Sequence, residues 1–335
     1  MISFASDYTT GAHPSVLEAL EKINLRSTKG YGTDEDCARA EKTIQALCNA
    51  PDAQVHFLVG GTQANLTLIA AALRPHEAVI CAETGHINVH ETGAIEAIGH
   101  KVLGIPTNDG KITPETIEAM VARHPDEHMV KPALVYISNT TEVGTVYTAQ
   151  EIEAISACCK KLGLFLYLDG ARIGSAIQAG GAPLDVLARC CDAFTIGGTK
   201  NGALFGEAMV LIHPALQRDF RYIIKQNGGM LAKGWLLGAQ FEALLKDGTY
   251  FSIAAHANAM AEKIAAAMLE KGYVFAYPPV SNQLFVIMSD AQAEKIAQNV
   301  IFQLGEARSK DQNAWRFVTS WSTRPEDVET LISLL

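Results

Sequence analysis

The stretches "LFLYLDGARIG" at residues 164–174 and "AFTIGGTKNGAL" at residues 193–204 each consist of an apolar run followed by a polar loop. Near-continuous apolar runs rich in β-forming residues are typical of strands that are buried on both faces, as in a parallel sheet. The helical pattern "PLDVLARC" at residues 183–190 lies between the two runs. This strand–helix–strand order predicts two parallel strands whose polar loops lie at the same edge of one sheet.

The same alternation of strands and helices continues on both sides of this unit. It predicts an α/β fold with a mostly parallel sheet and helices on both faces. Further strands are expected at residues 55–60, 78–83, 133–139 and 208–212, and helices at residues 63–73, 113–123 and 148–163.

The character of the sequence changes near residue 247. A long alanine-rich helix is predicted over residues 251–272, and it is followed by short strands at 282–288 and 315–321 and a helix at 293–305. We therefore expect a large domain over residues 1–246, which includes the N-terminal segment 1–15, and a smaller C-terminal α+β domain over residues 247–335.

The composition limits the partners and the location of the protein. The 335 residues are 48% hydrophobic and carry a formal net charge of -9, with no run of lysine or arginine. A nucleic-acid or anionic-membrane partner requires a concentrated cationic surface, so we expect neither. The sequence has no apolar stretch of roughly 18 residues and no signal-peptide pattern, which predicts a cytoplasmic protein. The seven cysteines include no C-x-x-C, which predicts reduced and mostly buried thiols.

Two further strand ends are followed by polar loops. "VGGTQANLT" at residues 59–67 places Gly61 and Thr62 at the start of a predicted helix, where free N–H groups and the helix dipole suit a phosphate. A plain strand-to-helix turn would explain these glycines equally well. "HINVHE" at residues 86–91 places His86 and His90 four residues apart, as in some metal sites. The order is not H-E-x-x-H and no third ligand is evident, so we expect no metal.

Asp169 and Lys200 are the most informative polar residues at the strand ends. A carboxylate that ends an apolar strand needs a cationic or N–H partner, and Arg172 could form a structural ion pair with it. In the functional interpretation, Asp169 keeps a pyridinium nitrogen protonated, Lys200 forms a Schiff base with a carbonyl cofactor, and a helix N-terminus binds its phosphate. These three features together match pyridoxal 5'-phosphate, so we expect this cofactor.

The chain resembles the low-specificity L-threonine aldolases, which belong to the β-eliminating-lyase-like branch of the fold-type I pyridoxal-phosphate enzymes. The resemblance extends from "SDYTTGAHP" to "WRFVTSW". It rests on motifs that stand in the family's order, namely "GYGTDEDCARAE", "GGTQAN", "GHINVHETGA", "ISNTTEVGTVY", "LDGARIG", "GGTKNGAL" and "LAKGWLLGAQF".

The resemblance implies a role in cofactor binding for several of these residues. Gly61 and Thr62 would hold the phosphate, and His86 would stack on the pyridine ring. Asp169 would contact the ring nitrogen and Lys200 would form the internal aldimine. Many members of the family have an arginine after the "GGM" glycines, whereas this chain has Lys233 as the nearest cation for the phosphate.

The resemblance also implies substrate contacts. The substrate carboxylate would be bound by Arg172 and Arg316, with a hydroxyl contributed by Ser6. Arg172 would also contact the cofactor. Fixing the substrate carboxylate would determine which substrate bond breaks. The bond held perpendicular to the pyridine ring of the cofactor is the one whose electrons the cofactor absorbs. Tyr31 would reach the site of a partner subunit.

A base is needed for the β-hydroxyl group of the substrate. His86 is the first candidate and His128 the second, because imidazole is the usual general base near neutral pH, although an ordered water could replace either.

The family resemblance implies retro-aldol cleavage of L-threonine or L-allo-threonine to glycine and acetaldehyde, with bulkier β-hydroxy amino acids as further substrates. It also implies a homo-oligomer, a dimer of dimers. β-Elimination or transamination of a small amino acid could use the same site. A nicotinamide oxidoreductase should have G-x-G-x-x-G near its N-terminus, which is absent here. Intact Lys200, Arg172 and Arg316 weigh against a non-catalytic binding protein.

Overall fold

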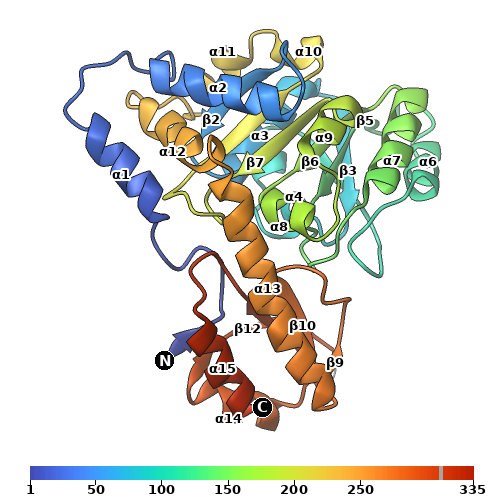
Figure 1. Cartoon of the computed structure of the whole chain (residues 1–335). Coiled ribbons are helices and arrows are strands. Elements are labelled where there is room, and N and C mark those ends of the chain that lie inside the picture. Colours follow the sequence, from blue (N-terminus) through green and yellow to red (C-terminus); the bar gives the residue numbers. More distant parts are fainter. Residues whose placement is uncertain (309–311) are drawn as a thin grey trace.

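The computed structural model describes residues 1–308 and 312–335. A seven-stranded sheet with the order β2-β8-β7-β6-β5-β3-β4 forms the centre of the larger part of the chain (Figure 1). Strand β8 is antiparallel to both neighbours, whereas the pairs from β7 to β4 are parallel. The strands are β2 (Gln54–Leu58), β3 (Glu77–Ala82), β4 (Lys101–Ile105), β5 (Lys131–Ser138), β6 (Phe165–Asp169), β7 (Ala193–Gly197) and β8 (Glu207–Leu211). The predicted mostly parallel sheet is confirmed.

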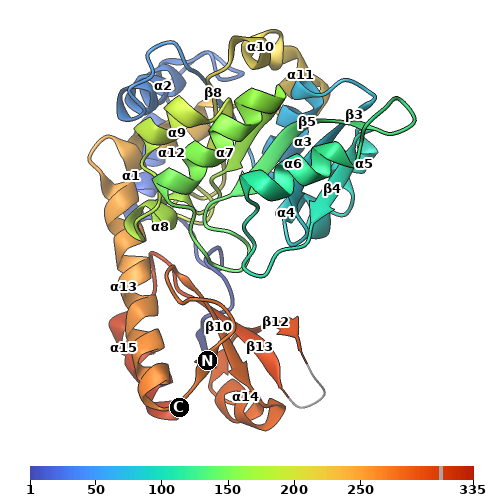
Figure 2. The same cartoon turned by 90° about the vertical axis from the view of Figure 1, so that its right-hand side faces the viewer.

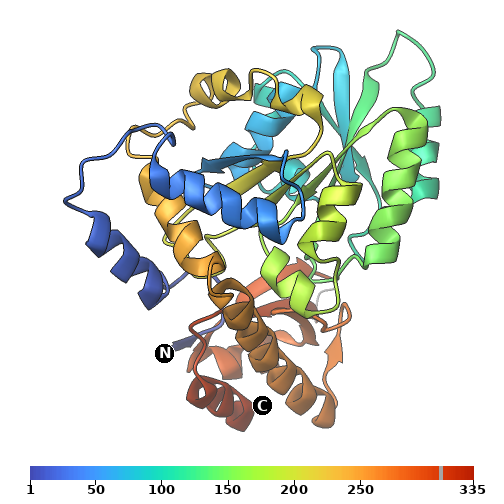
Figure 3. The ribbon, with the colours of Figure 1, turned by 45° about the horizontal axis from the view of Figure 1, so that its top comes forward.

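Helices cover both faces of this sheet, as predicted. Alternate residues of the strands point into two separate apolar cores, one on each face. The first core includes side chains of α2 (Glu35–Leu47), α6 (Pro114–Ala122), α7 (Ala149–Leu162), α9 (Leu184–Cys190) and α12 (Trp235–Leu245), several of which lie in front of the sheet in Figure 3. The second includes side chains of α3 (Gly61–Ala72), α4 (His86–Val89), α5 (Ala94–Ala97), α10 (Pro214–Gln217) and α11 (Phe220–Gln226). The helices α1 (Pro14–Ile23) and α8 (Ile173–Gln178) complete this part of the chain.

The smaller C-terminal part has its own antiparallel sheet with the order β12-β13-β10-β9 (Figure 2). Its strands are β9 (Val274–Phe275), β10 (Gln283–Met288), β12 (Gln303–Ala307) and β13 (Asn313–Val318), and its helices are α14 (Asp290–Ala297) and α15 (Pro325–Leu334). The predicted helix over residues 293–305 was wrong in its second half. Helix α14 ends at Ala297, and the β-branched pair of β11 (Val300–Ile301) instead pairs with β1 (Ile2–Ser3).

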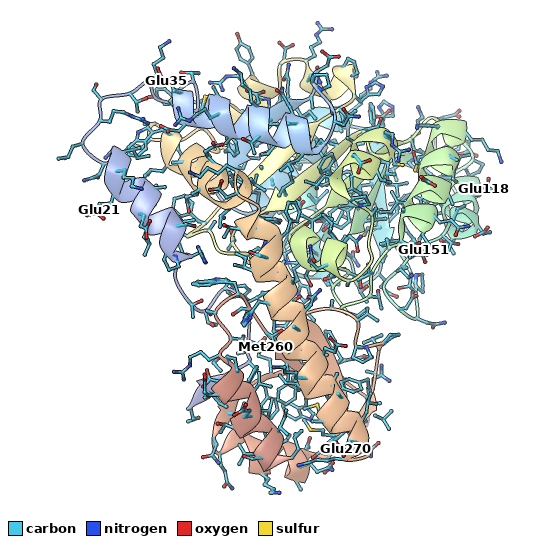
Figure 4. All side chains as sticks on the ribbon, viewed as in Figure 1. Glu21, Glu35, Glu118, Glu151, Met260 and Glu270 are labelled. Carbon is cyan, nitrogen blue, oxygen red and sulfur yellow. The ribbon has the colours of Figure 1, made fainter. Side chains whose placement is uncertain are left out.

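Helix α13 (Thr249–Glu270) joins the two parts. Near its start, Tyr250 and Ile253 pack into the core of the large sheet, whereas Met260 and later residues pack into the core of the small sheet. Figure 4 shows Met260 at the level where the helix leaves the larger part. We propose that residues 1–246 and 247–335 are the two domains, with Phe4 and β1 packed against the smaller one.

The loop that follows β5 contacts the smaller part. Ser281 Oγ donates to the Gly144 carbonyl oxygen over 2.7 Å, and Gln283 Nε2 donates to Thr140 Oγ1 over 3.3 Å. The smaller part therefore contacts the loop at the carboxyl end of β5.

The structure also bears on the predicted thiols and on membrane insertion. All seven cysteines lie in the described part of the chain, and each is buried and free, as predicted. Among the described residues, no helix combines the length and the apolar character that crossing a bilayer requires.

Candidate active site

Asp169, the last residue of β6, is the centre of a buried hydrogen-bond network. Its side chain is 5% exposed. Its Oδ2 accepts hydrogen bonds from Asn65 Nδ2 of α3 over 3.0 Å and from the Tyr136 hydroxyl of β5 over 2.8 Å. Its Oδ1 accepts a hydrogen bond from the Ala171 backbone N–H over 2.9 Å. Three donors stabilise the charged carboxylate, which allows an anion to persist in a buried position.

The network continues from Asp169 to His86. Asn65 Nδ2 also donates to Glu91 Oε1 over 2.7 Å, and His86 Nδ1 lies 2.7 Å from the same oxygen. Because an ionised carboxylate has only acceptor atoms, Glu91 Oε1 accepts both hydrogen bonds, so His86 Nδ1 carries the proton. The lone pair of a neutral His86 is then on Nε2, the ring atom that remains available to a ligand.

A second branch leads back from His86 to Asp169. The His86 backbone N–H donates to Glu142 Oε1 over 2.9 Å, and Ser138 Oγ donates to the same oxygen over 2.6 Å. Ser138 Oγ also lies 3.3 Å from the Tyr136 hydroxyl, which bonds to Asp169. Burial raises the pKa of Glu142, and the hydrogen bond from Ser138 opposes this rise. The ends of β3, β5 and β6 are thus linked by one network of hydrogen bonds and close polar contacts.

Lys200 lies in the loop between β7 and β8, at the same edge of the sheet. Burial lowers the pKa of its amine, and the Arg172 guanidinium lowers it further, while Asp7, Asp169 and Glu207 act in the opposite direction. A lowered pKa increases the fraction of neutral amine, which is the nucleophilic form that reacts with a carbonyl group.

The N-terminus of α3 offers backbone donors at this edge. Its N-cap is Gly60, and no side chain caps this end of the helix. The space where a Cβ of Gly60 or Gly61 would stand is open, with no atom within 4 Å. Unbonded N–H groups at the end of a 12-residue helix attract an anion, and Thr62 adds an exposed hydroxyl group.

Arg172 is paired with Asp7, which corrects one sequence-based interpretation. Its Nε and Nη2 donate to the two carboxylate oxygens of Asp7 over 2.6 and 3.0 Å. Asn282 Nδ2 of the smaller part donates to Asp7 Oδ2 over 3.0 Å. Burial alone would raise the pKa of Asp7, but the charges of Arg172 and Lys200 lower it below its ordinary value. Arg172 is therefore not the ion-pair partner of Asp169.

Arg316 and Ser6 retain unused donors. Arg316 Nη2 bonds to Gln303 and, over 3.5 Å, to the Ala5 carbonyl oxygen. Among the described groups, the buried Arg316 Nε and Ser6 Oγ have no hydrogen-bond partner. Burial and the charge of Arg172 lower the pKa of Arg316, so a ligand carboxylate would relieve the repulsion between the two guanidinium groups.

Tyr31 and Lys233 lie together, and neither takes part in the network around Asp169. The Tyr31 N–H donates to the Ala232 carbonyl oxygen over 3.1 Å, and Lys225 Nζ lies 5.1 Å from the centre of the Tyr31 ring. Tyr31 and Lys233 are both exposed. Tyr31 lines a hollow of about 380 Å³ next to the edge strand β2.

His128 is the one predicted site residue that the fold places at the wrong edge. It is exposed, precedes β5 by three residues, and bonds through its backbone N–H to Asp126 Oδ1 over 3.1 Å. The site lies at the carboxyl end of β5, eight residues further along an extended strand. A spacing argument cannot recognise this, because a strand of this length carries the chain from one edge of the sheet to the other.

Several residues of the site were missed from the sequence. They are Asp7, Asn65, Glu91, Tyr136, Glu142, Glu207 and Asn282. A signal for some of them was present, since Asn65 stands in "GGTQAN" and Glu142 in "ISNTTEVGTVY", directly after strand ends. In the described chain, no group of three or more histidine, cysteine or acidic side chains is arranged to hold a metal ion.

The donor set fits a phosphorylated aldehyde with a basic ring nitrogen. Lys200 offers an amine, the uncapped end of α3 offers N–H groups, and Asp169 offers a carboxylate that is already oriented by three donors. Lysine and aspartate at the ends of neighbouring strands of a mostly parallel sheet define the fold-type I pyridoxal-phosphate enzymes, and this chain has that fold.

Comparisons with known proteins identify the family. The family profile of the beta-eliminating lyases matches residues 3–291. The chain is 35% identical to the low specificity L-threonine aldolase of Pseudomonas aeruginosa over 336 residues, which covers 98% of this chain and 95% of that protein. This chain belongs to the beta-eliminating lyase family.

Solved structures agree with this assignment. A threonine aldolase structure from Leishmania major is 45% identical, has a TM-score of 0.98, and matches over 100% of this chain and 98% of that chain. A serine palmitoyltransferase from Sphingomonas wittichii shares only the fold, with 16% identity and a TM-score of 0.76 over 99% of this chain and 86% of that chain.

Proposed function

We propose that this protein is a pyridoxal-phosphate-dependent aldehyde-lyase that splits L-threonine and L-allo-threonine into glycine and acetaldehyde. The observation that carries this proposal is the buried hydrogen-bond network at Asp169 together with Lys200. It occurs in a chain that is 35% identical, over nearly its full length, to a low specificity L-threonine aldolase. When bound, the cofactor supplies an electron sink for the bond pair released at the substrate Cα.

The chain's own residues would hold this cofactor. Lys200 would bond to its aldehyde carbon, Gly61 and Thr62 would bind its phosphate at the start of α3, and Asp169 would bond to its ring nitrogen. His86 would lie against the pyridine ring of the cofactor. Its orientation is fixed by hydrogen bonds from its backbone N–H to Glu142 and from its Nδ1 to Glu91.

The substrate would be held by its carboxylate. Arg172 already gives two donors to Asp7, so Arg316 Nε and Ser6 Oγ, which are buried and unpartnered in the described structure, are the groups that most need an acceptor. Fixing the carboxylate fixes the rotation of the substrate about its N–Cα bond, which selects the Cα–Cβ bond for cleavage. His86 Nε2 would accept the proton of the β-hydroxyl group.

The nature of the products tests this function. Purified holoenzyme should release glycine and acetaldehyde in equal amounts from both diastereomers of L-threonine. A keto acid with ammonia would instead indicate β-elimination, and pyridoxamine phosphate would indicate transamination, so either result in place of acetaldehyde would contradict the proposal.

We expect the Arg316→Leu variant to raise the KM for threonine about 10- to 100-fold, because the lost charged hydrogen bonds contribute about 1.5–3 kcal/mol. Cofactor binding should be unchanged, as judged from the absorbance of the bound cofactor. Arg324→Leu is the matched control, because Arg324 is exposed and pairs with Asp327 on α15. An unchanged KM for Arg316→Leu would remove this residue from the carboxylate site.

We also propose that the protein is a homo-oligomer, a dimer that pairs into a tetramer, with Tyr31 and Lys233 reaching the cofactor region of a partner. The two residues lie close together on two exposed segments that are joined by the hydrogen bond from the Tyr31 N–H to the Ala232 carbonyl oxygen. Tyr31 has a positive φ of 59°. The exposed side chains of Tyr31 and Lys233 are therefore available to contact a second copy of the chain.

A shared site links activity to association. Dilution below the dimer dissociation constant should lower the specific activity and release the cofactor in parallel, because neither chain alone completes the pocket. Sedimentation and activity are measured at matched concentrations. A monomer with full activity would contradict the shared site and leave the chemistry of Lys200 unaffected.

A further inference from the structure

Glu207 is a buried acidic residue of the site that takes no part in the cofactor and substrate contacts proposed above. It begins β8 and is the cross-strand partner of Gly197 in β7 and of Leu58 in β2, so it lies at the carboxyl edge of these two strands. Its side chain is 4% exposed. Among the described groups, its buried Oε2 has no hydrogen-bond partner. An unpartnered carboxyl oxygen in the interior is costly to folding, so its presence points to a function.

The sheet places Glu207 on the same face as Asp169. Met209 and Leu211 follow it at alternate positions of β8 and pack into the same core as Tyr167, which precedes Asp169 by two residues in β6. Because side chains of a strand alternate between the two faces, Glu207 and Asp169 point to the same side. They lie on β8 and β6, which are separated by β7 alone.

The loop that carries Lys200 is fastened directly to the start of β8. The backbone N–H groups of Gly198 and Thr199 donate to the Gly206 carbonyl oxygen over 2.9 and 3.2 Å. The Gly206 N–H in turn donates to Thr199 Oγ1 over 3.0 Å. Thr199 and Gly206 immediately precede Lys200 and Glu207. The two ionisable residues therefore each follow a residue of one hydrogen-bonded pair.

The groups that face Glu207 come from three other elements. Asp169 and Tyr167 belong to β6, Lys200 to the loop after β7, and Tyr250 to α13, and each interacts with its charge. Of these four groups, Lys200 carries the positive charge. Burial raises the pKa of the Glu207 carboxyl to about 8, Asp169 adds to the rise, and Lys200 opposes it.

We propose that Glu207 is a positioning residue for Lys200, and that its carboxyl group is the proton partner of the Lys200 amine when the substrate amine displaces this lysine from the cofactor. The proposal rests on the function proposed above for Lys200. As the lysine is released, the O–H bond of the neutral Glu207 carboxyl breaks and its proton passes to the Lys200 nitrogen. A carboxyl and an amine thus become a carboxylate and an ammonium ion, and the proton returns when the lysine rejoins the cofactor.

The Glu207→Gln variant tests this pairing, because glutamine has the same shape and cannot ionise. In the wild-type holoenzyme, Glu207 becomes a carboxylate as the pH rises through its pKa of about 8, and this charge then stabilises the protonated lysine linkage. Without it, the pH midpoint of the absorbance change of the bound cofactor should fall by about one unit or more. Glu207→Asp, which keeps the charge, should recover part of this shift. Superimposable titrations of the wild type and Glu207→Gln would overturn the proposal.

A matched control separates this effect from the loss of any buried glutamate. Glu77 is also buried at the start of a strand, β3, but at the opposite edge of the sheet, where it bonds to the Arg74 N–H over 2.8 Å. Glu77→Gln should leave the cofactor titration unchanged. If borohydride labels a lysine other than Lys200, the proposed function fails; if it labels Lys200 and the titration is unaltered, only the role of Glu207 fails.

Stability provides a second, independent measurement. The folded pKa of Glu207, about 8, lies above its ordinary value of 4.5, so the folded state binds more protons between these values. Its contribution to stability is therefore lost as the pH rises through this interval. Holoenzyme with Glu207→Gln should gain stability relative to the wild type between about pH 5 and pH 8 in thermal unfolding. A variant that is less stable at every pH would make Glu207 a structural residue and would overturn the proposal.

Discussion

Replacing Lys200 with alanine should lower the rate of threonine cleavage at least about a thousandfold, because removal of a residue that bonds covalently in the reaction has effects of this size or larger. Lys200 is the lysine at the carboxyl edge of the large sheet whose amine interacts with Asp7, Asp169 and Glu207. The rate is measured as acetaldehyde released at saturating cofactor, so that weaker cofactor binding does not account for the loss.

Two variants serve as controls for this result. Lys200→Arg keeps the positive charge but has no amine that forms a Schiff base, and it should be as inactive as the alanine variant. Lys161→Ala removes an exposed lysine that pairs with Glu118 on the outer helices, and it should retain full activity. If Lys200→Arg kept a tenth or more of the wild-type rate, the lysine would act through its charge and the covalent role would be wrong.

The Asp169→Asn variant should lose activity about 100- to 1000-fold, which is the effect expected when one preorganised charged group that stabilises developing charge is removed. A neutral amide cannot keep the cofactor's ring nitrogen protonated, so the electron sink is weakened. Asn65 Nδ2 and the Tyr136 hydroxyl both donate to Asp169 Oδ2. If the NH₂ group of the new amide takes the place of Oδ2, it faces these two donors and the hydrogen bonds are lost. Steady-state kinetics and the absorbance of the bound cofactor measure the two effects separately.

Asp192 offers a matched control for Asp169→Asn. It is partly buried, precedes β7, and accepts a hydrogen bond from the Leu166 N–H over 2.7 Å at the opposite edge of the sheet. Asp192→Asn should therefore alter stability without altering the cofactor's absorbance. Near-wild-type turnover by Asp169→Asn would reject the assigned role of this residue.

The arrangement of the large sheet was predictable because its central strands are apolar on both faces. The strands around Asp169 and Lys200 lie within one or two residues of their predicted bounds. Strand β4 was missed, because it is a short edge strand with Gly104 in its interior and an exposed first residue, and such a strand has a weak sequence pattern. Helix α14 was predicted too long, because Val300 and Ile301 fit an apolar helical period as well as a strand.

The site was only partly predictable, for a different physical reason. Asp169 and Lys200 follow apolar strands, where an isolated charge stands out in the sequence. The partners that orient them come from elements distant in the chain: Asn65 lies 104 residues from Asp169, and Asp7 lies 165 residues from Arg172. Such pairings depend on strand order and on the docking of the smaller part, neither of which leaves a local pattern in the sequence.

The central claim is that Lys200 binds the cofactor covalently. Borohydride reduction of the wild-type holoenzyme, followed by peptide mapping, locates the lysine that carries the reduced cofactor. We predict that the label is on the peptide that contains Lys200, and that Lys200→Arg treated in the same way carries none. A label on any other lysine of the wild-type protein would contradict the account.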